Sequence, residues 1–171
     1  MTQRPPEFGA EFQDRELLAE AAGLKVEDLR EDLPAQIVFT GLSPLLIPVR
    51  DEETLRRAVR NDGAVRAAAE ASGAHYLYYF AVRGDGDLMV RMFDPYFGIG
   101  EDPATGSGAG PLGAYLAARG VAGMPGRVVL SQGEMVVRPS LLHVDVQPNG
   151  DSWTIRVGGG VRPVGEGYFD L

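Results

Sequence analysis

Leu112-Gly-Ala-Tyr-Leu-Ala-Ala-Arg119 is the stretch of sequence on which the predicted fold depends. It predicts a helix, because its residues are apolar on nearly every side and Gly120, a common helix-ending residue, follows it. A helix that is apolar all round is usually buried. We therefore expect the other elements of the chain to surround this helix.

Runs of aliphatic, aromatic and β-branched residues on both sides of the helix predict β-strands. Gly84-Asp-Gly-Asp87 has hairpin-turn composition, and further helices should begin at Asp14, Asp51 and Ala64. The fold class is α+β: a curled, mostly antiparallel sheet around a central apolar helix, in a single domain spanning residues 1–171. The predicted strands are residues 36–40, 45–49, 75–82, 88–93, 128–131, 135–138, 142–146, 153–157 and 161–168.

Composition excludes several classes of function. Acidic residues outnumber basic ones by 24 to 16, which gives a formal net charge of −8. A negative field repels nucleic acid and anionic lipid, so neither nucleic acid nor a membrane is an expected partner. The chain has no cysteine, which excludes disulfides and cysteine nucleophiles. No stretch resembles a secretory signal or a membrane span, and we expect a cytoplasmic protein.

Residues 98–110 combine many glycines with two acidic residues directly before the apolar helix. Glycines allow close backbone approach, and successive amides at a helix start bind anions. Glu101 and Asp102 place carboxyl groups beside those donors, an arrangement suited to removing a proton next to a carbonyl group. Spacing alone leaves a second interpretation open, which is a glycine-rich turn with a surface acidic pair. The stretch has neither the lysine of a phosphate loop nor the βαβ context of a dinucleotide site.

Several strings in the second half of the chain resemble the phenazine-biosynthesis isomerase (PhzF-like) family. The most specific is Glu101-Asp-Pro-Ala-Thr-Gly-Ser107, which is similar to the signature of the family's second domain. Residues 3–90 agree with the family only in the order of their elements. The supporting strings are Arg91-Met-Phe-Asp-Pro95, Gly98-Ile99, Gln132-Gly133, Met135, Arg138-Pro-Ser140 and Val157-Gly-Gly159.

The resemblance implies a diaminopimelate epimerase-like fold, in which two similar domains enclose an active site that works on small carboxylic acids without a cofactor. It implies that Asp102 is the catalytic acidic residue, and that Gly106 and Ser107 offer amides, and Ser107 a hydroxyl, to the substrate carboxylate. The substrate-binding set implied in this way is Glu101, Thr105, Gly106, Ser107 and Gly108. No metal site is expected, since neither His75 nor His143 has another histidine or a carboxylate at ligand spacing.

The sequence departs from the family pattern at two places. After Ser107 the chain reads Gly108-Ala-Gly-Pro111, where the family usually has a small residue, a histidine and then apolar residues. We expect a looser helix start here, with Pro111 in the first turn and a mobile or wide anion cradle. The family's first-domain motifs, Gly-Asn-Pro with a catalytic glutamate beyond it and a Gly-His element, do not occur.

The chain is therefore expected to correspond to the carboxyl-terminal half of a two-domain protein. Three explanations stay open: a naturally split enzyme with a separate N-terminal-half protein, a fragment, or a half that forms a homodimer. The segment from Met1 to Pro6 resembles the strand that crosses between the two domains. An edge strand at this position would be left to pair with a partner.

Two functions from different classes fit these features. The leading hypothesis is half of a PhzF-like isomerase or epimerase, which uses proton transfer on a small carboxylate and needs the other half for full activity. The alternative is a noncatalytic carboxylate-binding or assembly module that keeps the fold. A purely structural interaction domain is the least favoured interpretation.

Overall fold

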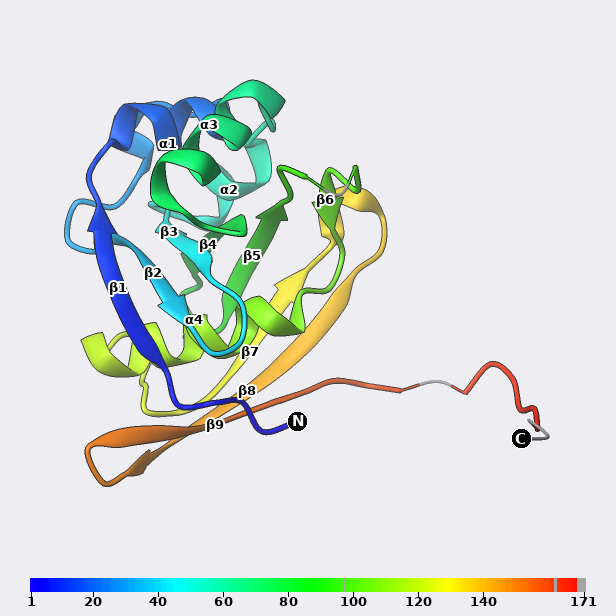
Figure 1. The fold of residues 1–171 in the computed structure, drawn as a ribbon. Coiled ribbons are helices and arrows are strands. Elements are labelled where there is room, and N and C mark those ends of the chain that lie inside the picture. Colours follow the sequence, from blue (N-terminus) through cyan, green and yellow to red (C-terminus); the bar gives the residue numbers. More distant parts are fainter. Residues whose placement is uncertain (97, 162, 169–171) are drawn as a thin grey trace.

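The computed structural model of the 171-residue chain describes residues 1–96, 98–161 and 163–168. These residues form a curled nine-stranded sheet with helices on both faces (Figure 1). The strands are β1 (Glu7–Phe12), β2 (Ala35–Phe39), β3 (Pro44–Pro48), β4 (Tyr76–Val82), β5 (Leu88–Phe93), β6 (Glu101–Asp102), β7 (Gly126–Gln132), β8 (Ser140–Asn149) and β9 (Ser152–Gly158). The helices are α1 (Arg15–Ala21), α2 (Glu52–Arg57), α3 (Asp62–Ser72) and α4 (Gly106–Arg119), with the 3-10 turns η1 (Val26–Asp28) and η2 (Glu134–Val136).

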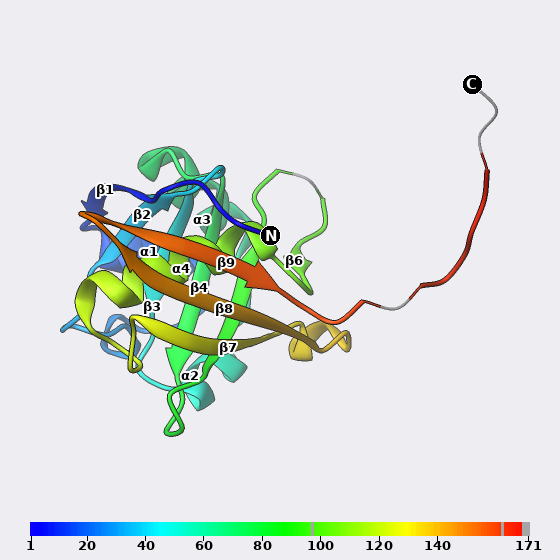
Figure 2. The same cartoon turned by 90° about the horizontal axis from the view of Figure 1, so that it is seen from below.

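The sheet is mixed. Its order is β1-β2-β3-β4-β5-β7-β8-β9, and the short strand β6 pairs with β5 off this path. The pairs β3–β4 and β5–β7 are parallel, while the other strand pairs are antiparallel, including the predicted hairpin of β4 and β5. Met1 to Gln3 lie along the outer edge of β9 (Figure 2), where the amide of Gln3 donates to the Ile155 carbonyl at 2.9 Å. The first residues of the chain thereby extend the curl beyond its last strand.

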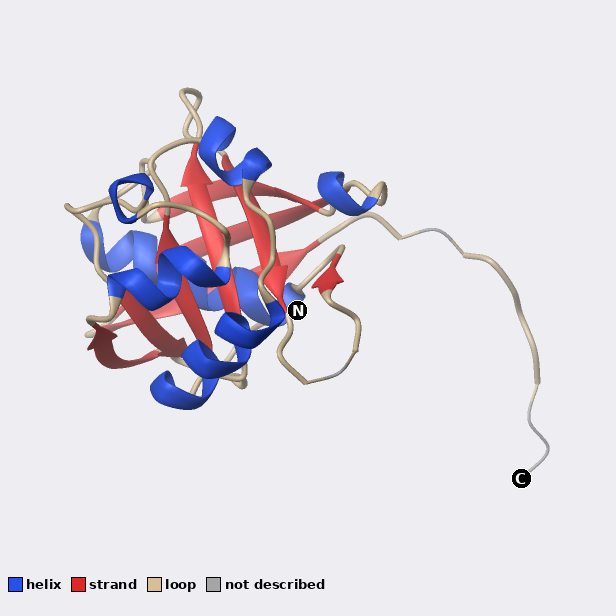
Figure 3. Ribbon diagram, turned by 90° about the horizontal axis from the view of Figure 1, so that it is seen from above, coloured by secondary structure: helices blue, strands red, loops and turns tan. Residues whose placement is uncertain are grey.

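Strand β4 separates two hydrophobic cores. Its sequence Tyr-Leu-Tyr-Tyr-Phe-Ala-Val is apolar without interruption, as expected for a strand that is covered on both faces. Tyr76, Tyr78 and Phe80 face the core that contains α4. The residues between them, Leu77 and Tyr79, face the core beneath α1, α2 and α3. Figure 3 shows those three helices together over the outer face of the sheet.

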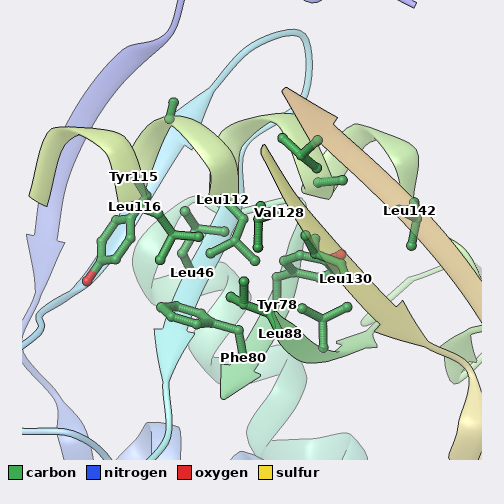
Figure 4. Packing of buried hydrophobic residues seen from close by; sticks show 14 of the residues in the cluster. Leu46, Tyr78, Phe80, Leu88, Leu112, Tyr115, Leu116, Val128, Leu130 and Leu142 are labelled. Carbon is green, nitrogen blue, oxygen red and sulfur yellow. The ribbon is translucent and has the colours of Figure 1, made fainter. Parts of the chain in front are cut away.

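Helix α4 is buried along most of its length. Leu112, Tyr115 and Leu116 are fully buried and pack against residues of several strands, among them Leu46 and Val128 (Figure 4). The rings of Phe80 and Tyr115 meet edge to face with centroids 5.7 Å apart. The expected burial of the apolar segment is found for residues 112–117, whereas Ala118 is exposed and Arg119 is half-buried.

Local capping explains where the outer helices begin. The Asp14 carboxylate accepts from the Leu17 amide at 3.0 Å, and Asp51 accepts from the Thr54 amide at 2.7 Å. Both acids were expected helix starts, and the two helices lie where the sequence predicts them. None of the helices in the described ranges is long and apolar enough to cross a membrane.

Three sequence-based expectations about secondary structure are wrong. Helix α4 begins at Gly106, so its first turn contains the glycines of the loop and Pro111 lies in the second turn. The predicted strand at 135–138 is instead part of a tight loop, because Gly133 and Val137 adopt left-handed conformations and the Arg138 amide returns to the Gly133 carbonyl at 3.0 Å.

The predicted strand at 161–168 is the third such case. The described part of this segment, residues 161 and 163–168, carries no strand, and Arg162 lies outside the described residues. Pro163 cannot donate to a neighbouring strand, and Gly165 and Gly167 weaken any extended pairing. The edge of β9 is in addition occupied by Met1 to Gln3.

Gly113 should be required for the approach of α4 to β8. A Cβ atom at this position would lie 2.6 Å from Cγ1 of Val144 and 3.0 Å from Cγ2 of Val146. Gly113→Ala should therefore overpack the core and lower the free energy of unfolding by about 1–3 kcal/mol in urea denaturation. Gly63→Ala is the matched control in a helix, because a Cβ there meets only an Asn61 oxygen at 3.6 Å. Equal stability of Gly113→Ala and the unmodified chain would contradict this packing.

Candidate active site

The loop before α4 is anchored by a buried ion pair. Nε and Nη2 of Arg91 donate to the two carboxylate oxygens of Glu101 at 2.9 and 2.6 Å. Nη1 of Arg91 donates to the carbonyls of Leu55 and Ala58, which end the α2 region. Both side chains are almost completely buried. Glu101, which the resemblance placed among the substrate-binding residues, thus has both oxygens engaged by Arg91 and fastens β6 to the sheet.

The amide of Gln132 organises the residues that follow. Its Oε1 accepts from the Tyr78 hydroxyl at 3.1 Å and from the Thr105 amide at 3.2 Å. Its Nε2 donates to the Asp102 carbonyl and to Thr105 Oγ1, both at 2.7 Å. Gln132 is buried, and all its donor and acceptor positions are in use. Gln132, which belongs to one of the family-like strings, therefore holds the loop between β6 and α4 in place.

Asp102 is half-buried beside the start of α4. Because Thr105 Oγ1 accepts from Gln132 Nε2, the hydroxyl proton of Thr105 is free to point at Asp102, whose Oδ2 accepts it at 2.7 Å. Among the described residues, Oδ1 of Asp102 has only a long contact of 3.5 Å, with the Ala104 amide. One carboxylate oxygen is thus fixed, and the other is available to a ligand.

The first amides of α4 form a donor pair. Thr105 is the N-cap residue of the helix, but its hydroxyl is directed to Asp102 and does not cap the helix. Within the described part of the chain, the amides of Gly106 and Ser107 donate to no protein group. Free first-turn amides carry the positive end of the helix dipole and favour a bound anion.

The glycines after Ser107 are packed closely, contrary to the expectation of a mobile or wide cradle. A Cβ atom on Gly108 would lie 3.1–3.2 Å from the ring of Tyr78. One on Gly110 would lie 2.7 Å from Cδ of Gln3. Gly108 is buried against Tyr78 at the helix start. Its absent side chain lets β4 approach the helix.

Two residues at the helix start were missed by sequence reasoning. The hydroxyl of Tyr76 lies 3.0 Å from Ser107 Oγ. The side chain of Gln3 donates to the Gly106 carbonyl at 3.4 Å and accepts from Thr40 Oγ1 at 2.6 Å. The alternation of β4 could have placed Tyr76 and Tyr78 on one face, but no local pattern points to Gln3.

An open hollow of about 810 Å³ borders the start of α4. Gly106 and Ala104 line one side of it, and the ends of β8 and β9 line the other. Three of the family-like strings meet here, although they are far apart in the sequence. His143 is exposed and also lines this hollow. The further lining residues are Pro139, Ser140, Leu141, Leu142, Val157, Gly158, Gly159, Gly160 and Val161.

Among the described residues, no group of three or more histidine, aspartate or glutamate side chains is placed to hold a metal ion. The groups gathered at the helix start include the Asp102 carboxylate, the Ser107 hydroxyl and the amides of Gly106 and Ser107.

The fold places the chain in a structural class. It matches a Pseudomonas aeruginosa structure described as a predicted epimerase, with a TM-score of 0.75 and 39% identity over 93% of this chain and 54% of that one. A curled mixed sheet of epimerase-like fold is thus the architecture that the two share.

The family assignment is more specific. The family model for phenazine biosynthesis-like protein, PhzC-PhzF, matches residues 1–167, and the chain belongs to this family. An uncharacterized isomerase of Clostridium acetobutylicum is 34% identical over 155 residues, which are 86% of this chain and 51% of that protein. The trans-2,3-dihydro-3-hydroxyanthranilate isomerase of Pseudomonas chlororaphis is 38% identical over 82 residues, which are 47% of this chain and 30% of that protein. The chain spans about half the length of the first curated relatives that it matches.

Removal of the Gln132 amide should loosen the loop. Gln132→Leu leaves the Tyr78 hydroxyl, the Thr105 amide and the Asp102 carbonyl without their partner, which should cost about 1–3 kcal/mol of unfolding free energy. The Thr105 amide should also exchange faster with deuterium. Gln147→Leu, which removes an exposed amide bonded to Asp145, is the control and should change neither quantity. Unchanged exchange at Thr105 in Gln132→Leu would show that the network does not hold the loop.

Proposed function

We propose that this chain is one half of a PhzF-like isomerase or epimerase that moves a proton on a small carboxylic acid without a cofactor. The observation that carries the proposal is the placement of Asp102 beside two free helix amides and the Ser107 hydroxyl. The amides of Gly106 and Ser107 would bind the substrate carboxylate. Asp102 would then exchange a proton with a carbon atom of the bound acid through Oδ1, which has only the long Ala104 contact.

The proposed reaction converts the substrate into an isomer, so that no atom is gained or lost overall. A base takes the proton from carbon, and the electron pair spreads toward the neighbouring unsaturated group. A proton then returns to the opposite face or to another carbon atom, so that the product is an isomer of the substrate. Asp102 supplies one proton-transfer group, and a two-sided transfer needs a second one. We propose that a second domain supplies it, with no metal or cofactor involved.

The need for a second half is supported by length and by sequence. The chain corresponds to 51% of the length of the Clostridium relative and 52% of a Bacillus subtilis relative. The strings that mark the family's first domain in the resemblance, Gly-Asn-Pro and Gly-His, are missing from the sequence. The resemblance assigns this chain to the carboxyl-terminal half, one domain of the epimerase-like pair.

An apolar rim beside the hollow is the proposed contact with the missing half. We define this rim as Val137, Leu141 and Val161, whose side chains are 88%, 58% and 89% exposed. Val137 has a φ of 57°, a left-handed conformation that is costly for a β-branched residue. Such strain is common at functional sites, and here it directs the chain between Gly133 and Arg138.

Substitutions should separate binding from proton transfer. With a first-half protein present, Asp102→Asn should lower deuterium incorporation at the reacting carbon about 100-fold or more and leave carboxylate binding nearly unchanged. Ser107→Ala should weaken carboxylate binding about 3- to 10-fold through the loss of one hydrogen bond. Mass spectrometry of the substrate after incubation in D₂O measures the exchange, and calorimetry measures the binding.

The noncatalytic alternative is supported by one observation, which is that Gly106 lines the hollow whereas Asp102 does not. A carboxylate-binding module would bind small acids, lose binding in Ser107→Ala, and catalyse no exchange with any first-half protein. Absence of exchange under conditions in which a full-length relative is active would therefore favour the module and overturn the isomerase.

The rim should be required for assembly with the other half. Val137→Asp combined with Leu141→Asp should abolish restoration of activity by a first-half protein, because two charges would be placed in an apolar contact. The fold should survive, since both side chains are exposed and aspartate adopts left-handed conformations more readily than valine. Val59→Asp, at another exposed apolar position, is the control. Full activity of the double variant would exclude the rim as the contact.

A further inference from the structure

We propose that Tyr76 is a positioning residue that turns the hydroxyl of Ser107 toward a bound carboxylate. The inference rests on the proposed function, since it concerns the same ligand. It adds a residue that lies outside the family-like strings, at the start of β4, and that is not among the residues lining the hollow.

The position of the Tyr76 hydroxyl is well defined. Tyr76 begins β4 and is only 3% exposed. Its ring meets the ring of Tyr78 edge to face, with centroids 6.3 Å apart and an interplanar angle of 81°. Tyr78 is in turn tied to Gln132 and covered by Gly108. The phenol oxygen is thereby held at 3.0 Å from Ser107 Oγ.

The proton on this phenol determines the direction of the hydrogen bond. Burial raises the pKa of Tyr76, although its bond to Ser107 acts in the opposite direction, so the phenol keeps its proton at neutral pH. Within the described residues, Ser107 is the only hydrogen-bond partner of the Tyr76 hydroxyl. When an anion binds, both groups are satisfied only if Tyr76 donates to Ser107 Oγ and Ser107 donates to the anion.

This order of donors favours a charged acceptor over a neutral one. A hydroxyl that already accepts a hydrogen bond is a stronger donor, and hydrogen bonds to a charged acceptor are stronger than those between neutral groups. An amide of the same shape can instead donate its own N–H to Ser107, and it gains less from the phenol. Tyr76 should therefore contribute to selectivity for carboxylates.

The test uses the full chain and two ligands of matched shape. Anthranilate is the anionic probe, and anthranilamide is its neutral counterpart. Titrations followed by the ¹H–¹⁵N signals of Gly106 and Ser107 give both affinities, even when they are weak. Tyr76→Phe should weaken anthranilate binding about 3- to 10-fold and anthranilamide binding less than about 2-fold. In a Ser107→Ala background, Tyr76→Phe should cause no further loss.

Tyr79→Phe is the matched control. It removes the same atom from the same strand, where the hydroxyl donates to the Leu18 carbonyl at 2.7 Å within the other core. If Tyr76→Phe does not fold, a measurement on the unmodified chain tests the role of Tyr76 instead. The ¹³Cζ signal of labelled Tyr76 should move on addition of anthranilate and stay in place with anthranilamide.

The outcomes distinguish this inference from the proposed function. Absence of any response of Gly106 and Ser107 to anthranilate in the unmodified chain would overturn carboxylate binding at this site, and the role of Tyr76 with it. Normal binding by the unmodified chain would overturn the role of Tyr76 alone if Tyr76→Phe kept the full affinity for anthranilate, if it weakened both ligands equally, or if the ¹³Cζ signal did not move.

Discussion

Close packing at the glycines of α4 is the constraint on which the rest of the structure depends. The ring of Tyr78 lies against Gly108, the side chain of Gln3 against Gly110, and Val144 against Gly113. A Cβ atom at any of these positions would push the sheet or the N-terminal segment away from the helix. The same contacts fix the position of the helix start, so that the packing of the core also determines where the amides of Gly106 and Ser107 lie.

The polar groups around the helix start form a second layer that depends on this packing. Gln132 reaches Asp102 and Thr105 because Tyr78, which it also contacts, is held against the helix. Thr105 then uses its hydroxyl for Asp102 in place of capping the helix, and the first amides stay available. The amides of Gly106 and Ser107 are therefore available because Thr105 donates its hydroxyl to Asp102 and does not cap the helix. Proton transfer and anion binding are linked through that residue in the proposed mechanism.

The second domain that we propose bears on two features of the chain. The matched relatives are about twice as long as this chain, and the apolar rim at Val137, Leu141 and Val161 is exposed beside the hollow. A site for proton transfer needs to be closed to water, and the hollow beside the start of α4 is open. The second domain that we propose would account for both features.

The sequence by itself determined most of the strands, the capped helices and the burial of residues 112–117, because these depend on local periodicity and on residue types. It did not reveal that α4 starts at Gly106, since glycine has a low helix propensity and tertiary packing overrides it here. The prediction of a strand at 135–138 was wrong because Val137 adopts a left-handed conformation, whereas valine usually prefers extended backbone. The contacts of Ser107 with Tyr76, of Gly106 with Gln3 and of Thr105 with Gln132 join residues that are distant in the chain. Only the closure of the sheet around the helix brings these partners together, and for this reason the tertiary structure alone decided how the site is held.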